Sequence, residues 1–316
     1  MKQFTSIKDI TDLNGLLSLS KKIKKNPFGF KSYGENKTLG LLFFNPSLRT
    51  RLSTHKAAMN LGMNVMVMNL NTDGWSIELE DGTIMNEGTQ EHIKEAAGVI
   101  SQYCDIIGIR TFASLNDKTK DYDEEIINKF IKHALVPVIS LESATLHPLQ
   151  SFSDLITIDE AKTKVKPKVV LTWAPHPKRL PRAVANSFAE WMSKTDVDLV
   201  VANPKGFDLS PEFTKGIEVT HNQDDALKNA DFVYTKNWSS FDNYGEIGTE
   251  FDDWVVTKEK MDLTNDGKFM HCLPVRRNVV VSDDVIDSEN SLVLQQANNR
   301  VYAAQTVLLK ILQDEN

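Results

Sequence analysis

Phe44-Asn45-Pro46-Ser47-Leu48-Arg49-Thr50-Arg51 is the stretch of this 316-residue chain that most strongly indicates its fold. It ends an apolar run over residues 38–44 and opens a segment with helical spacing over 48–61, so a strand is predicted to run directly into a helix. The first N–H groups of a helix have no partner within it and carry partial positive charge, so they bind anions. Two arginines and two hydroxyls add charge-assisted hydrogen bonds. The stretch therefore predicts a phosphate site; the alternative is that Ser47 is an ordinary N-cap and the arginines are solvated.

Strand-like and helix-like segments alternate along the rest of the chain. In the first half, predicted strands cover residues 38–44, 64–70, 105–110 and 136–141, and predicted helices cover 48–61, 91–103 and 124–133. In the second half, predicted strands cover 168–173, 198–202, 231–234 and 268–271, and predicted helices cover 149–161, 183–193, 224–229 and 297–312. Such alternation is typical of parallel sheets with helices on both faces. The predicted fold class is α/β, with two doubly wound parallel-sheet domains and an active-site cleft between them.

The length of the chain also favours two domains, because it is about twice the size of a usual single domain. The helix over 148–161 lies at the midpoint and is the expected connection between them. The last helix is expected to pack back on the first domain. The predicted domains are therefore residues 1–148 with 297–316, and residues 149–296.

Polar residues follow many of the predicted strands at the carboxyl end, where ligands bind in open α/β sheets. In the first half these are Ser47–Arg51, Arg110, Glu142 and His147. In the second half they are His176, Lys236 and the segment 271–277. The sequence thus places its chemically active side chains at one edge of each predicted sheet.

Composition excludes several classes of protein. The net charge of −7 argues against general nucleic-acid binding. Cys104 and Cys272 have no metal-ligand spacing and form no disulfide framework, so no metal is expected. Residues 1–17 lack the apolar core of a signal peptide, and no apolar run approaches a membrane span. We expect a cytoplasmic protein without nucleic-acid or membrane partners.

Three motifs follow one another along the chain: Ser47-Leu48-Arg49-Thr50-Arg51, His147-Pro148-Leu149-Gln150 and His271-Cys272-Leu273-Pro274-Val275-Arg276-Arg277. In this order and spacing they resemble the aspartate/ornithine carbamoyltransferase family, essentially from end to end. The resemblance implies that the first domain binds carbamoyl phosphate and the second binds the amine. It also implies a homotrimer with shared active sites, and no cofactor.

The resemblance assigns roles residue by residue. Backbone N–H groups of Ser47, Leu48 and Arg49, with the Arg49 guanidinium, would bind the phosphate. Thr50, Arg110 and His147 would surround the carbonyl oxygen, and Gln150 would bind the carbamoyl NH₂. Cys272 would lie near the attacking amine as a proposed proton acceptor. The implied catalytic residues are Arg49, Thr50, Arg110, His147 and Cys272, and the implied carbamoyl phosphate contacts also include Trp75, Pro148, Leu149, Leu273 and Arg300.

Each of these residues also has a structural interpretation. His147 precedes a proline and could be a turn residue, and Arg110 could be a surface charge. Cys272 lies between apolar neighbours and could be an inert buried thiol. The three motifs together favour the functional interpretation in each case.

The segment Tyr234-Thr235-Lys236-Asn237-Trp238-Ser239-Ser240 indicates which amine is carbamoylated. The ornithine enzyme has an Asp here, followed by Ser-Met-Gly, and that Asp pairs with the free α-ammonium of ornithine. Lys236 would repel an ammonium, whereas an acylated amine removes that charge and offers carboxylates to pair with. A solvated Lys236 is the alternative. The sequence therefore resembles the N-acylornithine carbamoyltransferase branch more closely.

In that branch, residues aligned with Glu142, His176, Lys236 and Arg276 hold the acylated amino acid, and Trp75 reaches a neighbouring subunit's site. A Glu before the segment Glu91-His92 accompanies acetylornithine, and a non-acidic residue accompanies succinylornithine. Gln90 stands there and removes a carboxylate that would repel a succinyl tail. Lys178, Arg179 and Arg182 add positive charge, unless they form a solvated loop. N-succinylornithine is the expected acceptor; N-acetylornithine and, less favoured, free ornithine are the alternatives.

Two other classes of protein fit less well. A dinucleotide-dependent oxidoreductase would need a G-x-G-x-x-G turn after a strand, and none is present. A binding protein without catalytic activity would have no reason to keep all the side chains that the transfer needs.

Overall fold

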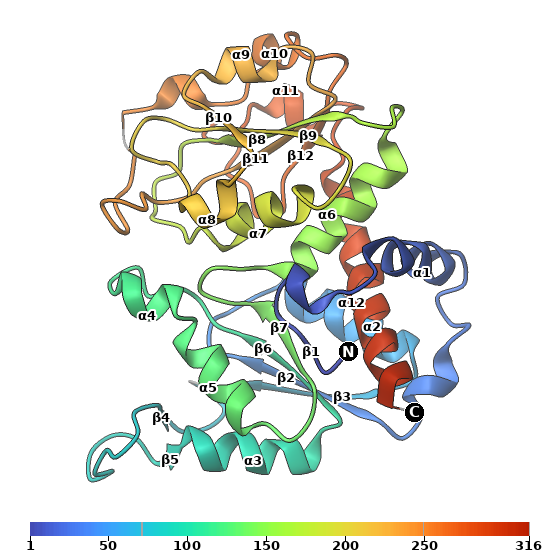
Figure 1. The fold of residues 1–316 in the computed structure, drawn as a ribbon, viewed down its shortest axis with the longest axis vertical. Helices are drawn as coiled ribbons and strands as arrows, with labels where there is room; N and C mark the ends of the chain where they lie inside the picture. The colour runs from blue at the N-terminus through green and yellow to red at the C-terminus, as the bar shows by residue number, and fades with distance from the viewer. Residues whose placement is uncertain (71, 249, 316) are drawn as a thin grey trace. The chain divides into compact units, whose positions relative to one another are not determined.

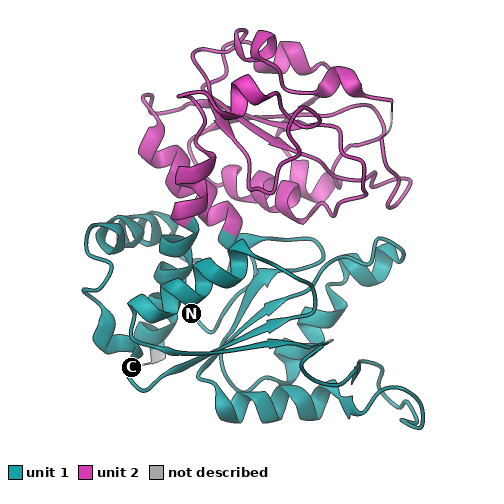
Figure 2. Ribbon diagram, turned by 180° about the vertical axis from the view of Figure 1, so that it is seen from behind, with its two compact units in different colours: residues 1–149, 300–316 teal, residues 150–299 magenta. Residues whose placement is uncertain are grey.

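Two five-stranded parallel sheets, each within its own compact unit, form the core of the chain. The computed structural model describes residues 1–70, 72–248 and 250–315. Unit 1 comprises Met1–Leu149 and Arg300–Asn316, and unit 2 comprises Gln150–Asn299 (Figure 2). The division therefore falls near the start of one helix, α6 (Pro148–Ala161), and within another, α12 (Val293–Glu315).

The sheet of unit 1 has the strand order β1-β7-β6-β2-β3, with every neighbouring pair parallel. All residues of β6 and β7 are buried, and β2 is buried after its first residue. Strands covered on both faces read as continuous apolar runs, as β2 does. The strand order reverses between β2 and β6, which makes that point the expected ligand crevice. The strands are β1 (Gln3–Phe4), β2 (Thr38–Phe43), β3 (Asn64–Asn69), β6 (Ile106–Arg110) and β7 (Val138–Glu142).

Helices cover both faces of this sheet. In Figure 1, α3 and α5 lie on one side, and α2 and α12 lie on the other. Asn60 on α2 donates to Gln305 on α12 at 3.1 Å, so the end of the chain packs within unit 1. A small parallel pair, β4 and β5, extends beyond α3. These elements are α1 (Leu13–Lys25), α2 (Arg49–Asn60), β4 (Ile77–Glu78), β5 (Glu91–His92), α3 (Ile93–Tyr103), α4 (Lys118–Tyr122) and α5 (Glu125–His133), with short 3₁₀ turns at Ile7–Asp9 and Lys31–Gly34.

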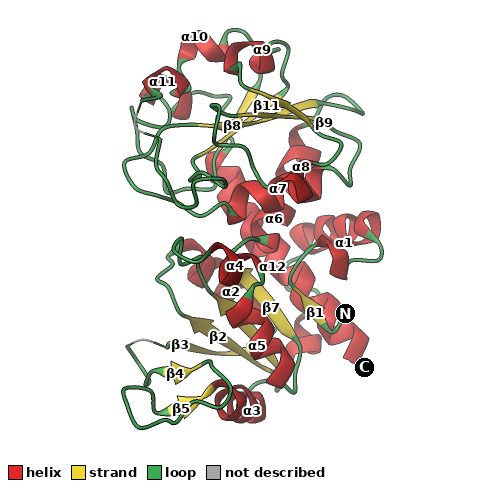
Figure 3. Ribbon diagram, turned by 60° about the vertical axis from the view of Figure 1, so that its left-hand side comes forward, coloured by secondary structure: helices red, strands yellow, loops and turns green. Residues whose placement is uncertain are grey.

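The sheet of unit 2 has the order β10-β9-β8-β11-β12, again parallel throughout, and it reverses between β8 and β11. Figure 3 shows α7 and α8 on one side of this sheet and α9, α10 and α11 on the other. The strands are β8 (Lys168–Trp173), β9 (Asp198–Ala202), β10 (Glu218–Thr220), β11 (Phe232–Lys236) and β12 (Lys268–Met270). The helices are α7 (Ala183–Met192), α8 (Pro211–Thr214), α9 (Gln223–Leu227), α10 (Lys258–Met261) and α11 (Asp283–Ile286), with a 3₁₀ turn at Asp252–Trp254.

The predicted fold of two doubly wound parallel sheets is confirmed, and every predicted helix and strand is present within a few residues of its expected ends. Several elements were not predicted: the strands β1, β4, β5 and β10 and the helices α1, α4, α8, α10 and α11. Within the described part of the chain, no helix is both long and apolar enough to cross a membrane. The described residues also contain no group of three or more His, Cys, Asp or Glu side chains placed to hold a metal ion.

Candidate active site

A buried polar cluster lies at the carboxyl edge of the unit 1 sheet, where the strand order reverses. The register pairs Arg110, the last residue of β6, with Phe43 of β2 on one side and Glu142 of β7 on the other. Thr50 enters from the first turn of α2, which follows β2, and Arg300 enters from α12. His147 completes the cluster just before α6. The carboxyl ends of β2, β6 and β7 thus meet at one edge of the sheet.

Hydrogen bonds connect the members of this cluster. Arg110 donates to Thr50 Oγ1 at 3.3 Å and to Glu142 Oε2 at 2.5 Å. Arg300 donates to the same Thr50 hydroxyl at 2.7 Å. His147 Nε2 lies 3.4 Å from Glu142 Oε2, and every one of these side chains is buried. The structure therefore brings together the residues predicted to surround a carbonyl oxygen.

The charge of this cluster favours an anionic ligand. It contains two buried guanidinium groups, Arg110 and Arg300, against one carboxylate, Glu142. Burial lowers the pKa of His147 well below that of a free imidazole, and the charges of Arg300 and Arg110 lower it further. The imidazole is therefore neutral and does not add to the repulsion. An excess positive charge that is withdrawn from water is stabilised most by an anion bound beside it.

The start of α2 contributes backbone N–H groups next to this cluster. Ser47 Oγ accepts from Thr50 N at 3.3 Å, so the N-cap interpretation of Ser47 is partly correct. Leu48 is exposed and Arg49 is half-buried at the same turn. Arg51 points elsewhere: it donates to Asn69 and lies over the Phe43 ring, 4.8 Å from its centroid. Arg49 and the N–H groups of the turn are thus the anion-binding elements of this segment.

Glu124 holds the loop that carries His147, and sequence reasoning missed it. Its buried carboxylate accepts hydrogen bonds from three consecutive residues of the loop after β7: from Ser143 Oγ at 2.6 Å, from Ala144 N at 3.1 Å and from Thr145 N at 2.8 Å. Burial raises the pKa of Glu124, although these hydrogen bonds favour its charged form. The loop ends at His147, and Pro148, Leu149 and Gln150 form the buried first turn of α6.

A second cluster, of basic side chains, lies where the unit 2 sheet reverses. Lys236 ends β11, and His176 follows the neighbouring strand β8. His176 Nε2 accepts from Arg276 Nε at 3.2 Å, and Lys236 Nζ donates to the carbonyl of Asn237 at 3.1 Å. Burial lowers the pKa of His176, and the charges of Lys236, Arg276 and Lys178 lower it further. The three predicted substrate contacts of unit 2 therefore form one positive cluster, whereas Glu142 belongs to the cluster of unit 1.

The segment that follows β12 has a constrained backbone. His271 N donates to Gln296 Oε1 at 3.0 Å, and Leu273 N donates back to His271 Nδ1 at 2.8 Å. Leu273 has a φ of 55°, in the left-handed region that costs an apolar residue roughly 1–2 kcal/mol. Strain of this kind is found mostly where a structure must present a group in one position. Cys272 is half-buried here, so it is not the fully buried thiol of the structural interpretation.

Trp75 and Gln90 come together on the β4–β5 extension of unit 1. The indole of Trp75 donates to Glu91 Oε2 at 2.7 Å, and Gln90 N donates to the carbonyl of Ser76 at 3.1 Å. Both side chains are exposed, and 56% of Trp75 is accessible to solvent. An exposed indole that is held in one orientation is a typical contact residue for another surface.

Arg182, which was expected to add positive charge to the substrate half or to belong to a solvated loop, is not in a solvated loop. Arg182 is buried, donates to the carbonyls of Ser239 and Ser240 at 3.0 and 2.5 Å, and lies 4.5 Å from the Tyr244 ring centroid. Its guanidinium therefore stabilises the segment after β11. Lys178 and Arg179 are exposed.

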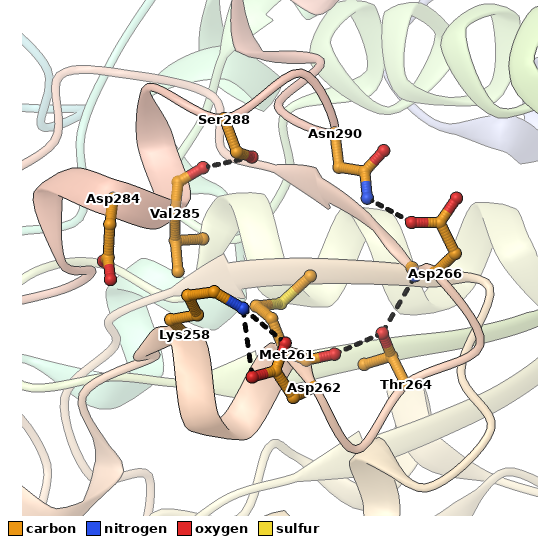
Figure 4. A pocket seen from close by; sticks show the side chains of 10 residues that line it. Lys258, Met261, Asp262, Thr264, Asp266, Asp284, Val285, Ser288 and Asn290 are labelled. Carbon is orange, nitrogen blue, oxygen red and sulfur yellow. Dashed lines mark hydrogen bonds and ion pairs between the residues drawn. The ribbon is translucent and has the colours of Figure 1, made fainter.

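A cavity of about 260 Å³ elsewhere in unit 2 contains none of the predicted site residues (Figure 4). Asp266 and Gly267, which line it, precede β12, so it lies by the amino end of that strand and not at the carboxyl edge of the sheet. The polar groups that line it form hydrogen bonds with one another. Lys258 donates to Asp262 at 2.7 Å, and Asn290 donates to Asp266 at 2.6 Å. This cavity is not a candidate active site.

The buried His147 should make stability depend on pH. The folded chain keeps His147 neutral, whereas the unfolded chain binds a proton near pH ~6.5. The contribution of the neutral His147 side chain to the free energy of unfolding is therefore full above that pH, and it is lost as the pH falls below it. We expect the drop in melting temperature between about pH 7.5 and about pH 5.5 to be smaller in His147→Gln than in the wild type. His133→Gln on α5 is the control and should keep the wild-type drop; an equal drop in His147→Gln would contradict the assignment.

Comparison with known proteins completes the description of the site. Residues 2–160 match the carbamoyl-P binding domain of aspartate/ornithine carbamoyltransferases, and residues 181–311 match their Asp/Orn binding domain. The chain is 51% identical to an N-succinylornithine carbamoyltransferase of Bacteroides thetaiotaomicron over 99% of both chains. It is 34% identical to an N-acetylornithine carbamoyltransferase of Xanthomonas axonopodis pv. citri, over 98% of this chain and 96% of that one. The chain also resembles a crystal structure of an N-acetyl-L-ornithine transcarbamylase variant, which is complexed with carbamyl phosphate and N-succinyl-L-norvaline. The TM-score is 0.93 and the sequence identity is 33%, over 98% of this chain and 100% of that one.

Proposed function

This chain belongs to the aspartate/ornithine carbamoyltransferase family, and we propose that it transfers the carbamoyl group of carbamoyl phosphate to the δ-amine of N2-succinyl-L-ornithine. The products are N2-succinyl-L-citrulline and phosphate. The observation that carries the proposal is the buried cluster of unit 1, in which two guanidinium groups meet on the Thr50 hydroxyl. A site of this kind stabilises a dianionic phosphate and a developing oxyanion together.

Carbamoyl phosphate fits the donors of this cluster. The N–H groups at the start of α2 and the Arg49 guanidinium would hold the phosphate, with Arg300 beside them. The carbonyl oxygen would lie among Thr50, Arg110 and the neutral His147, which can donate one N–H to it. These donors act on charge that grows when the amine attacks, so they lower the barrier more than they tighten substrate binding.

The basic cluster of unit 2 supports an acylated amino acid as the acceptor. Lys236 and Arg276 offer charged donors to carboxylates and would repel a free α-ammonium, and His176 holds the Arg276 guanidinium by accepting from its Nε. N2-succinyl-L-ornithine has two carboxylates, and its only free amine is the δ-amine. Its δ-nitrogen forms a bond to the carbamoyl carbon, the bond from that carbon to the phosphate oxygen breaks, and the nitrogen gives up a proton. We assign Cys272 as the acceptor of that proton, an assignment that an unchanged kcat in Cys272→Ser would contradict.

The test of the proposed function is a steady-state assay with carbamoyl phosphate and four amines: N-succinylornithine, N-acetylornithine, ornithine and aspartate. The highest kcat/KM is expected for N-succinylornithine, with a product heavier than the acceptor by one carbamoyl group. Preferred turnover of ornithine or aspartate would overturn the choice of acceptor, and no turnover of any amine would overturn the function.

Gln90 is proposed to set the preference for the succinyl group. A neutral amide can donate a hydrogen bond to the succinyl carboxylate, whereas a Glu carboxylate would repel it. We expect Gln90→Glu to lower the ratio of kcat/KM for N-succinylornithine over N-acetylornithine by roughly tenfold, since one charged contact contributes roughly 1.5–3 kcal/mol. Thr89→Ser, one residue before it, is the control and should keep the ratio. An unchanged ratio in Gln90→Glu would remove Gln90 from the specificity determinants.

We also propose a homotrimer in which Trp75 serves a neighbouring subunit's site. Exposed apolar side chains on α2 and on the edge strand β3 support this assembly, because an uncovered apolar edge favours association. They are Leu52, Met59, Met66 and Met68. Sedimentation equilibrium should give about 107 kDa, three times the 35.6 kDa of one chain; a monomer mass would contradict it.

We propose that the reaction belongs to arginine biosynthesis, as the family resemblance implies, and that the protein is cytoplasmic. Cell fractionation tests the location. Deletion of the gene tests the pathway, since growth without added arginine would contradict it.

A further inference from the structure

We propose that Asp154 is a positioning residue for this carbamoyl transfer: it fixes the side-chain amide of Gln150 so that the amide oxygen, and not the nitrogen, is available to the carbamoyl NH₂. The inference rests on the proposed function, in which Gln150 contacts that NH₂ group. It assigns a role to a buried carboxylate that none of the proposed steps uses.

Asp154 lies at the centre of a hydrogen-bonded group in unit 2. It is fully buried on α6, one helical turn after Gln150. Its Oδ1 accepts from Gln150 Nε2 at 2.7 Å and from Gln296 Nε2 at 2.7 Å. The other end of the Gln296 amide, Oε1, accepts from His271 N at 3.0 Å. Asp154 is thus held by a residue that also anchors the segment carrying Cys272.

The chemistry of the donors decides which way the Gln150 amide faces. A carboxylate accepts hydrogen bonds and has none to donate, so it must face the amide nitrogen. The Gln150 oxygen is then on the opposite branch of the amide, where it can accept from an N–H of the carbamoyl group. In the reverse orientation, the NH₂ group of Gln150 would face the NH₂ group of the carbamoyl moiety. Two donors would then meet, and the carbamoyl nitrogen would be held less well. Because catalysis depends on the aligned reactants, such a change should act on the rate.

A role in packing alone would not call for a carboxylate at this position. Burying an aspartate is costly unless its partners compensate, and an apolar side chain of similar size would fill the space at lower cost. The hydroxyl of Tyr234 lies in the same region, where burial raises its pKa well above the usual value and the charges of Asp154 and Cys272 raise it further. Asp154 thus contacts Gln150 directly and is linked through Gln296 to the segment that carries Cys272.

A double-mutant cycle tests the proposal. Asp154→Ala is expected to lower kcat/KM for carbamoyl phosphate by about 10²-fold. In the Gln150→Ala background the same change should cost at least about tenfold less, because the residue through which Asp154 acts is already gone. Asp154→Asn keeps an acceptor oxygen and should recover most of the activity. If Asp154→Ala does not fold, Asp154→Ser takes its place in the cycle.

The outcomes separate this inference from the proposed function. Effects of Asp154→Ala and Gln150→Ala that simply multiply would overturn the positioning role, as would an Asp154→Asn enzyme that folds but is as slow as Asp154→Ala. Ser153→Ala is the matched control: Ser153 is the buried neighbour that donates to the Gln296 carbonyl at 2.8 Å, and its loss should change kcat/KM less than about threefold. Absence of turnover in the wild type would instead overturn the proposed function.

Discussion

Arg110→Met is expected to lower kcat for carbamoyl transfer by about 10³-fold, the size of effect seen when a buried oxyanion donor is removed. Arg110 is buried and donates to Thr50 and to Glu142, so its guanidinium is fixed before the substrate arrives. No reorganisation is then needed as negative charge grows on the carbonyl oxygen. Methionine keeps most of the volume of the side chain but has no donor and no charge. Stopped-flow measurement of phosphate release at saturating substrates gives kcat.

Stability must be separated from catalysis in this variant. Arg110→Met leaves the buried Glu142 carboxylate without its main partner, which can cost roughly 3–5 kcal/mol of stability. The double variant Arg110→Met/Glu142→Gln removes that charge and should regain melting temperature while kcat stays low. Recovery of kcat together with stability would show that Arg110 acts only on the fold.

Lys236→Asp is expected to raise KM for the N-acylornithine about 10²-fold while KM for carbamoyl phosphate changes less than about threefold. Lys236 lies in the basic cluster with His176 and Arg276, and a carboxylate there would repel the carboxylates of the acceptor. The reversed charge should also favour a free α-ammonium, so relative turnover of ornithine should rise. Initial rates with each substrate varied in turn separate the two KM values.

The control for this variant is Lys205→Asp, which makes the same change at an exposed position of unit 2. It should leave both KM values near those of the wild type. Equal increases in both KM values for Lys236→Asp would show that the change disturbs the whole unit, and would count against Lys236 as an acceptor contact.

The elements of the site were predictable where a local pattern decides the structure. The apolar run of β2, followed by a turn and helical spacing, specifies a strand that enters a helix, so the position of Thr50 could be predicted. Arg110 and Glu142 each end a buried strand, and the carboxyl ends of parallel strands meet at one edge. The helix α1 had a visible signal in Asp12, whose side chain accepts from Gly15 N at 2.8 Å as an N-cap, but its apolar spacing was not recognised.

The rest depends on contacts between distant parts of the chain. Glu124 acts through a loop about twenty residues away, and Asp154 meets Gln296 across 142 residues, so neither role is visible in a local pattern. The four-residue spacing of Gln150 and Asp154 was the one usable signal, because residues at that spacing share a helix face. The role of Arg182 likewise depends on distant contacts: its sequence position suggests only added positive charge, whereas burial against Tyr244 gives its guanidinium a structural role.

A crystal structure with a bisubstrate analogue, which joins a phosphonoacetyl group to the δ-nitrogen of N2-succinyl-L-ornithine, tests the central claim most directly. We expect the phosphonate on the N–H groups of Ser47–Arg49, its carbonyl oxygen at Thr50 and Arg110, and a carboxylate of the amino acid at Lys236. An analogue bound elsewhere, or with its phosphonate at Lys236 and its amino-acid end at Thr50, would contradict the account.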